Sequence, residues 1–143
     1  MATTDKIRVL VVDDHHMVRK GLIVLLENFD DFEVVGDAGD GQAGVMLAQR
    51  YKPDIVLMDM IMPGMDGVDT ARSIKALYPA LPVLLLSSIG DESYKQYPGL
   101  FASIMTKPVK QNVLLKVLIQ ELKQIEPANK IKTVQPKEPA VHN

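Results

Sequence analysis

The stretch PDIVLMDMIMPGMDG, residues 53–67, joins a short apolar run to a single acid and then to a turn. Residues 55–58, Ile-Val-Leu-Met, have the length and aliphatic character of a β-strand that is buried on both faces. Asp59 follows this run directly, although burying an unpaired carboxylate costs free energy. The proline and glycines after it predict a turn, and Asp66 is placed to cap a helix at about 67–78. The stretch therefore predicts a strand followed by a helix. Between them lies Asp59, whose burial would be costly unless its carboxylate has a functional role.

Four other short apolar runs have the same strand-like character. They are residues 9–12, 33–35, 83–86 and, as the weakest, 103–105. Helical patterns lie between these runs, with apolar residues at helical spacing or an N-cap acid. The residues that mark them are Val18, Leu22, Leu25 and Phe29, then Asp40 before about 41–51, and finally Val113, Leu114, Val117, Leu118 and Leu122. Strands that alternate with helices imply right-handed crossovers. The predicted fold class is a doubly wound α/β domain, in which helices cover both faces of a five-stranded parallel sheet.

Two segments lack a clear helical or strand pattern. Residues 90–99, GDESYKQYPG, hold two glycines, a proline and few apolar residues, so we expect a short or mobile fourth helix there. Residues 126–143 are rich in proline, lysine and other polar residues and show no periodicity, which predicts a flexible tail or linker. The predicted organisation is one domain over 6–125 followed by this tail.

Composition limits the classes of function. A chain of 143 residues, 47% hydrophobic and 24% charged, has the size and balance of a single globular domain. Without cysteine it has no disulfide, thiolate nucleophile or Cys-ligated zinc. The start MATTDKIR lacks the apolar stretch of a signal peptide, so we expect a cytoplasmic protein. A net charge of −2 and the lack of an apolar run of about 20 residues predict neither direct nucleic-acid binding nor a membrane span.

The predicted topology brings distant polar residues together. All strands of a parallel sheet end at the same edge, where open α/β folds bind their ligands. Asp13, Asp14, Asp59, Ser87 and Lys107 each stand at or just after such an end. Three carboxylates held together would raise one another's pKa unless a cation lay among them. Because the available donors are hard oxygens, the expected cation is Mg²⁺ rather than zinc or copper.

An acid beside Mg²⁺ and a lysine favours phosphoryl transfer. A carboxylate can act as the nucleophile and become an aspartyl-phosphate. The metal and Lys107 would neutralise the equatorial oxygens of the transferring group. Ser87 could then donate a hydrogen bond to the product. Each of these residues has an ordinary interpretation when it is taken alone. Asp13 and Asp14 could cap a helix, Lys107 could lie on the surface, and Ser87 could bond to the backbone. The prediction therefore depends on their joint placement.

The segments VLVVDD, DIVLMDMIMPGMDG, PVLLLSS and TKP occur in that order over about residues 6–125. Together they resemble the receiver domain of two-component response regulators, which has a CheY-like, flavodoxin-like fold with strand order 2-1-3-4-5. The resemblance implies that Asp59 accepts a phosphoryl group from a phosphohistidine of a histidine kinase or phosphotransfer protein. It also implies an output partner or fused effector domain, and a phosphorylation-dependent dimer is a further expectation.

The same resemblance assigns roles to the other residues of the site. Asp14 and Asp59 would bind Mg²⁺ directly, together with the main-chain carbonyl of Ile61, and Asp13 would act through water. Lys107 would contact the phosphoryl group, and the Lys107–Pro108 peptide bond would be cis. Ser87 would be the switch hydroxyl that moves toward the phosphoryl group and remodels the face formed by the end of the strand at 83–86, the segment 90–99 and the strand at 103–105.

Three departures from the family pattern matter for the output. Ile104 stands where the family usually has Tyr or Phe, and Ser87 and Lys107 are slightly close in sequence. The first 75 or so residues look like receivers of DNA-binding regulators, whereas residues 87–114 look more like receivers of hybrid histidine kinases, so the parent architecture stays open. Ile61 and Ile89, two positions beyond the acceptor and the switch hydroxyl, are apolar. We expect them to leave the hydrolytic water unoriented and to give a long-lived phosphoryl group.

Several residues also fit other interpretations. His15 and His16 could form a ligand pair or a phosphohistidine, but adjacent residues at a helix start face different directions, so surface positions are predicted. His142 could bind metal adventitiously. A copper site is a weaker interpretation than core packing for the methionines at 58, 60, 62 and 65. An aspartyl-phosphate enzyme like the haloacid dehalogenases would need a second acid where Ile61 stands.

Overall fold

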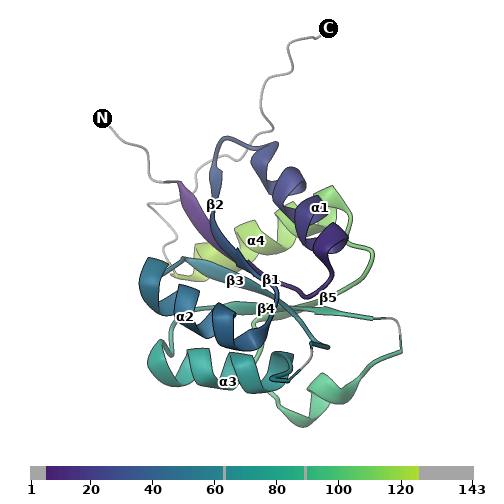
Figure 1. Cartoon of the computed structure of the whole chain (residues 1–143). Coiled ribbons are helices and arrows are strands. Elements are labelled where there is room, and N and C mark those ends of the chain that lie inside the picture. The colour runs from purple at the N-terminus through teal and green to yellow at the C-terminus, as the bar shows by residue number, and fades with distance from the viewer. Residues whose placement is uncertain (1–5, 63, 89, 126–143) are drawn as a thin grey trace, which may run out of the picture.

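A five-stranded parallel sheet forms the centre of the molecule (Figure 1). The computed structural model describes residues 6–62, 64–88 and 90–125, with the backbone alone at 122–125. The strands are β1 (Ile7–Val12), β2 (Phe32–Ala38), β3 (Ile55–Asp59), β4 (Val83–Ser87) and β5 (Ser103–Thr106). They lie in the order β2-β1-β3-β4-β5, and every neighbouring pair is parallel. The predicted fold class and strand order are confirmed.

Helices cover both faces of this sheet (Figure 1). They are α1 (His16–Glu27), α2 (Gly41–Tyr51), α3 (Gly67–Leu77), the 3₁₀ helix η1 (Ser93–Gln96) and α4 (Gln111–Ile125). Leu22 and Leu26 of α1 share one apolar cluster with Leu114 and Leu118 of α4. A second cluster on the other face includes Ala48 of α2 together with the α3 residues Ala71 and Ile74. The sheet thus has two separate cores, as a doubly wound fold requires.

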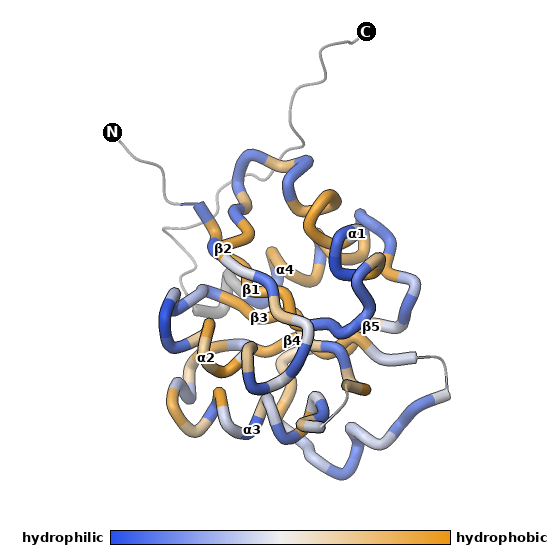
Figure 2. Tube along the Cα trace, in the orientation of Figure 1, coloured by the Kyte–Doolittle hydropathy of each residue, from blue (hydrophilic) through white to orange (hydrophobic). Residues whose placement is uncertain are grey.

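Burial separates the central strands from the edges. Residues of β1, β3 and β4 are almost all buried, and Figure 2 shows the hydrophobic residues concentrated along them. β2 and β5 lie at the two edges and are only partly covered. The expectation that all five strands are buried on both faces is therefore wrong for β2 and β5. A strand at a sheet edge has a neighbour on one side only, so solvent reaches it more easily.

The predicted helix starts are confirmed by their hydrogen bonds. The carboxylate of Asp40 accepts from Ala43 N at 2.8 Å, and that of Asp66 accepts from Asp69 N at 2.9 Å. Helix α1 ends at Glu27, so Phe29 lies beyond it but still packs in the core. The core role of the methionines is confirmed for Met58, Met60 and Met62, which are buried. They do not share one strand face, because β3 ends at Asp59 and Met60 joins a separate cluster.

Among the described residues of the connection from β4 to β5, η1 is the one helical element, which confirms the prediction of a short fourth helix. Tyr94, Leu100 and Phe101 from this connection pack against the core. Ile104, at the position of the family's aromatic residue, is 40% exposed on β5. The predicted tail 126–143, with His142, and Ile89 lie outside the described residues. Within the described part of the chain, no helix has the length and apolar character needed to cross a membrane.

Candidate functional site

The carboxyl edge of the sheet gathers the residues that the sequence analysis singled out. Asp13 and Asp14 follow β1 directly, and Asp59 is the last residue of β3. Ser87 ends β4, and its carbonyl accepts a hydrogen bond from Lys107 N at 2.8 Å. The register of the parallel strands, with Asp59 opposite Leu86, sets these ends side by side. The predicted convergence at this edge is therefore present in the structure.

Lys107 bridges two buried acids. Its Nζ donates to Asp59 Oδ1 at 2.9 Å and lies 3.3 Å from Asp13 Oδ2. Asp59 is 4% exposed and Asp13 is fully buried. Burial would lower the pKa of Lys107, but the hydrogen bond to Asp59 and the charges of both acids outweigh burial and raise this pKa. Lys107 is consequently a fixed positive charge beside Asp59.

Burial also governs the titration of Asp59. It raises the pKa of this carboxyl from 3.8 to about 6, helped by the charge of Asp13 and opposed by the hydrogen bond from Lys107. One lysine therefore does not fully compensate the two buried acids. A group whose charged form is this costly gains most from a further cation.

Three carboxylate oxygens make no hydrogen bond among the described residues: Asp13 Oδ2, Asp14 Oδ1 and Asp59 Oδ2. The first two have only ion-pair contacts, with Lys107 Nζ at 3.3 Å and with His15 Nδ1 at 3.2 Å. All three acids offer an oxygen within 4.8 Å of the others, in a set that also includes His15. Buried oxygens without donors are unusual, because each loses the hydrogen bonds it would make in water. These hard, negatively charged oxygens fit a divalent cation such as Mg²⁺.

Arg19 supports the turn that carries Asp13. Its Nη1 donates to the carbonyl of Asp13 at 2.6 Å, and its Nε donates to Asp37 Oδ2 at 2.7 Å. The carboxylate of Asp13 also accepts from His15 N at 2.8 Å. Sequence reasoning missed Arg19, whose only signal was a basic residue in the first turns of the helix that follows the two acids.

Gly67 allows α3 to begin against the end of β3. Its N–H donates to the carbonyl of Met60 at 2.8 Å. A Cβ at this position would lie 2.4 Å from the carbonyl oxygen of Asp59 and 2.9 Å from Met60 Cα, so a side chain has no space. This close approach fixes the backbone of Asp59, whereas Ile61, two residues further along, is 61% exposed.

Ser87 is at the predicted edge, but its hydroxyl faces the β4–β5 connection. The buried Oγ lies 3.1 Å from the carbonyl oxygen of Asp91 and 3.2 Å from that of Ser88, and donates to these carbonyls. The structure therefore brings Asp13, Asp14, Asp59 and Lys107 into one cluster. It leaves the hydroxyl of Ser87 bound to the loop. The cis Lys107–Pro108 peptide bond is confirmed.

The two histidines after Asp14 differ in their surroundings. His15 Nδ1 lies 3.2 Å from Asp14 Oδ1, 3.5 Å from Asp13 Oδ1 and 3.9 Å from Asp59 Oδ2. His16 Nδ1 instead lies 3.5 Å from Arg19 Nη2. Both histidines are exposed, as predicted, but the contact of His15 with the acids was missed. Spacing alone gives no signal for it, because the direction of the side chain depends on the turn.

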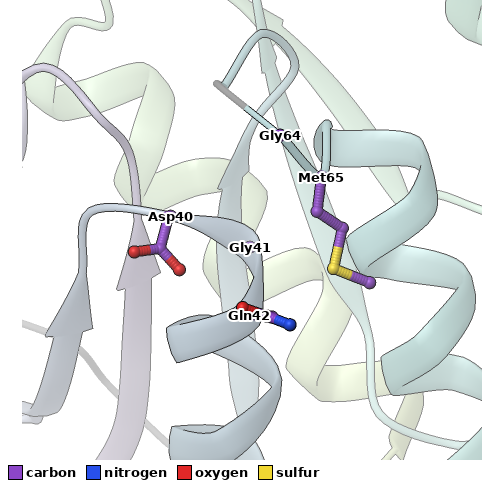
Figure 3. Close-up of a pocket in the computed structure, with 5 residues that line it drawn as sticks. All are labelled: Asp40, Gly41, Gln42, Gly64 and Met65. Carbon is purple, nitrogen blue, oxygen red and sulfur yellow. The ribbon is translucent and has the colours of Figure 1, made fainter.

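A separate hollow lies between the start of α2 and the turn before α3 (Figure 3). It is lined by Asp40, Gly41, Gln42, Gly64 and Met65. None of these residues belongs to the acid cluster, and Asp40 already serves as the cap of α2. The acid cluster at the sheet edge is therefore the candidate functional site.

Fold and site together define a receiver domain of two-component signalling. Residues 9–119 match the family described as response regulator receiver domain, and the chain belongs to this family.

Known proteins of this class are similar over most of the described chain. The transcriptional regulatory protein LiaR of Bacillus subtilis is 43% identical over 100 residues, which cover 70% of this chain and 47% of LiaR. The chain thus spans about half the length of this curated relative. The signal receiver domain of NarL from Mycobacterium tuberculosis has 33% identity and a TM-score of 0.75, covering 84% of this chain and 98% of that one. A CheX–CheY–BeF₃–Mg²⁺ complex from Borrelia burgdorferi has 25% identity and a TM-score of 0.72, and the match covers 79% of this chain and 87% of that one.

Proposed function

We propose that the chain acts as a phosphoacceptor in a two-component phosphorelay, with Asp59 as the acceptor. The observation that carries this proposal is the placement of Asp59, buried at the carboxyl edge with Oδ1 held by Lys107 and Oδ2 without a hydrogen bond among the described residues. A buried carboxylate with one fixed cation and two neighbouring acids suits nucleophilic phosphoryl chemistry better than it suits stability.

The proposed donor is a phosphohistidine of a histidine kinase or a phosphotransfer protein. A carboxylate oxygen of Asp59 forms the new P–O bond while the P–N bond breaks, and the departing imidazole nitrogen keeps the electron pair and takes a proton from water. Lys107, at 2.9 Å from Asp59, offsets negative charge on the transferring group. Asp14, Asp59 and the carbonyl of Ile61 would hold Mg²⁺, with Asp13 acting through water. When bound, Mg²⁺ supplies positive charge to the phosphoryl oxygens.

The proposed ligands have a parallel in the Borrelia complex, in which CheY is present with BeF₃ and Mg²⁺. Beryllium fluoride has the shape and charge of a phosphoryl group. The fold similarity to this complex, and the acid cluster of this chain, support the assignment of the same two kinds of ligand here.

Ser87 is the proposed switch residue. To donate to a phosphoryl oxygen, its hydroxyl must leave the carbonyls of Asp91 and Ser88, which it now contacts. Releasing these carbonyls would free the connection between β4 and β5, where the family's longer helix is reduced to η1. An output partner would then recognise the changed surface of this connection and of β5, where Ile104 stands at the position of the family's aromatic residue.

The proposed physiological role is control of an output partner or fused effector domain from a cytoplasmic receiver. The names of relatives such as LiaR, a transcriptional regulatory protein, favour transcription as the regulated process. We further propose that the receiver spans 6–125 and that 126–143 serves as a tail or linker. Direct binding of nucleic acid is not assigned to this chain, since its net charge is −2.

The test is labelling by acetyl phosphate with Mg²⁺. The wild type should take up one phosphoryl group per chain and keep it, whereas Asp59→Asn should take up none. Asp69→Asn, a change of an exposed acid in the first turn of α3, is the matched control and should label like the wild type. Equal labelling of wild type and Asp59→Asn, or no labelling of either, would refute the proposal. Continuous release of phosphate would instead indicate a phosphatase.

A further inference from the structure

The turn between β1 and α1 presents three donors in a row: Asp13, Asp14 and His15. His15 is the N-cap residue of α1, yet its side chain makes no capping hydrogen bond. Residues at this position usually have a side chain that caps the helix, and His is not among the favoured types. The imidazole is directed toward the acids instead, with Nδ1 3.2 Å from Asp14 Oδ1.

The distances around His15 Nδ1 fit the ligands of one metal ion. Around an octahedral ion with bonds of about 2.1 Å, neighbouring donors lie about 3.0 Å apart and opposite donors about 4.2 Å apart. The separations of 3.2 and 3.9 Å from Nδ1 to Asp14 Oδ1 and Asp59 Oδ2, the two acids proposed as direct ligands, fall within this range. The four donor atoms all lie within 4.8 Å of one another.

An independent observation shows that this cluster is prepared for a cation. Asp59 is at least nine-tenths buried, and its Oδ2 atom has no hydrogen-bond partner among the described residues and lies 3.9 Å from His15 Nδ1. Lys107 supplies only one positive charge to Asp59 and the buried Asp13. A cation bound to Asp59 Oδ2 would therefore also lie within reach of the imidazole.

We propose that His15 Nδ1 is a ligand of the metal site, which makes this a mixed nitrogen and oxygen site that takes first-row divalent transition metals. The inference rests on the proposed function, because it concerns the same cation. Mg²⁺ takes oxygen ligands, whereas Mn²⁺, Co²⁺ and similar ions also accept imidazole nitrogen. His15 thus raises the affinity for transition metals more than the affinity for Mg²⁺.

The experiment compares His15→Gln with His16→Gln, the adjacent histidine that faces Arg19. Metal-free protein is titrated with Co²⁺ and with Mg²⁺ by calorimetry. For His15→Gln, the ratio of Co²⁺ affinity to Mg²⁺ affinity should fall at least about tenfold. For His16→Gln, this ratio should stay within about twofold of the wild-type value. In proton NMR of the Co²⁺ form, a strongly shifted, exchangeable imidazole N–H signal should be present in the wild type and absent in His15→Gln.

Either of two results would overturn the inference. Equal losses of Co²⁺ and Mg²⁺ affinity in His15→Gln would mean that His15 only shapes the turn. Retention of the shifted N–H signal would mean that another histidine binds the metal. Acetyl phosphate labelling of the wild type is measured in parallel. Labelling without a nitrogen ligand would overturn this inference alone, whereas a nitrogen ligand without labelling of Asp59 would overturn the proposed function alone.

Discussion

Replacing Asp59 by Asn should stabilise the metal-free protein at neutral pH. The reason is that burial raises the pKa of Asp59 to about 6, against 3.8 for an ordinary aspartate. The ionised carboxylate is therefore less stable in the folded chain than in the unfolded chain. Asn keeps the size of the side chain and an acceptor oxygen for Lys107, but it carries no charge.

The magnitude and sign follow from proton linkage. A pKa difference of one corresponds to about 1.4 kcal/mol, so the difference for Asp59 corresponds to about 3 kcal/mol. Between pH 3.8 and about 6 the folded chain binds more protons at Asp59 than the unfolded chain does. Wild-type stability from this group is thus largest at low pH and falls as the pH rises through this window. Asp59→Asn should match the wild type near pH 4 and exceed it by about 3 kcal/mol above pH 6.

Urea denaturation followed by circular dichroism, in EDTA, measures this difference at several pH values. Asp69→Asn serves as the control for an acid-to-amide change and should differ from the wild type by no more than about 0.5 kcal/mol at neutral pH. Adding Mg²⁺ at pH 7.5 should then stabilise the wild type more than Asp59→Asn. The reasoning is refuted if Asp59→Asn is less stable than the wild type at pH 7.5, or if the difference between them does not change with pH.

Two further predictions concern the backbone around the site and the lifetime of its product. Gly67→Ala should destabilise the fold by at least about 2 kcal/mol in urea denaturation, because the new Cβ would clash with the carbonyl of Asp59. Gly21→Ala is the control: this position of α1 is open, so the change should stabilise the fold by up to about 1 kcal/mol. Equal effects of the two changes on stability would show that the close approach of Gly67 to the carbonyl of Asp59 does not exclude a side chain. Ile61→Asn with Ile89→Glu should shorten the half-life of the phosphoryl label roughly tenfold, because polar side chains can orient the hydrolytic water. Equal or slower loss of label from the double variant would contradict this prediction.

Regular patterns in the sequence were enough to predict the fold. The apolar runs predicted all five strands, and the N-cap acids Asp40 and Asp66 correctly marked the starts of α2 and α3. The convergence of Asp13, Asp59 and Lys107 followed from the rule that parallel strands end at one edge. Each of these inferences depends on periodicity or topology, which a single sequence carries well.

Local side-chain directions could not be predicted in the same way. The contact of His15 with the acids depends on the extended backbone at the N-cap of α1. The hydrogen bond of Arg19 to Asp37 depends on β2 lying close to α1. The hydroxyl of Ser87 could have faced either Asp59 or the loop, and only the path of the chain after β4 decides between them. Such choices rest on a few torsion angles that leave no pattern in the sequence.

The carboxylates of the acid cluster come from chain segments that meet only when β1 and β3 pair. Asp13 and Asp14 follow β1, whereas Asp59 is the last residue of β3. An ion that occupies the cluster therefore recognises the native chain alone and holds it against denaturation. At a hundred times its dissociation constant, such an ion adds about 2.7 kcal/mol to the free energy of unfolding. If the cluster binds Mg²⁺ as proposed, the concentration of this ion should raise the resistance of the molecule to heat and to proteases. A truncated chain that ends before β5 has no lysine beside Asp59.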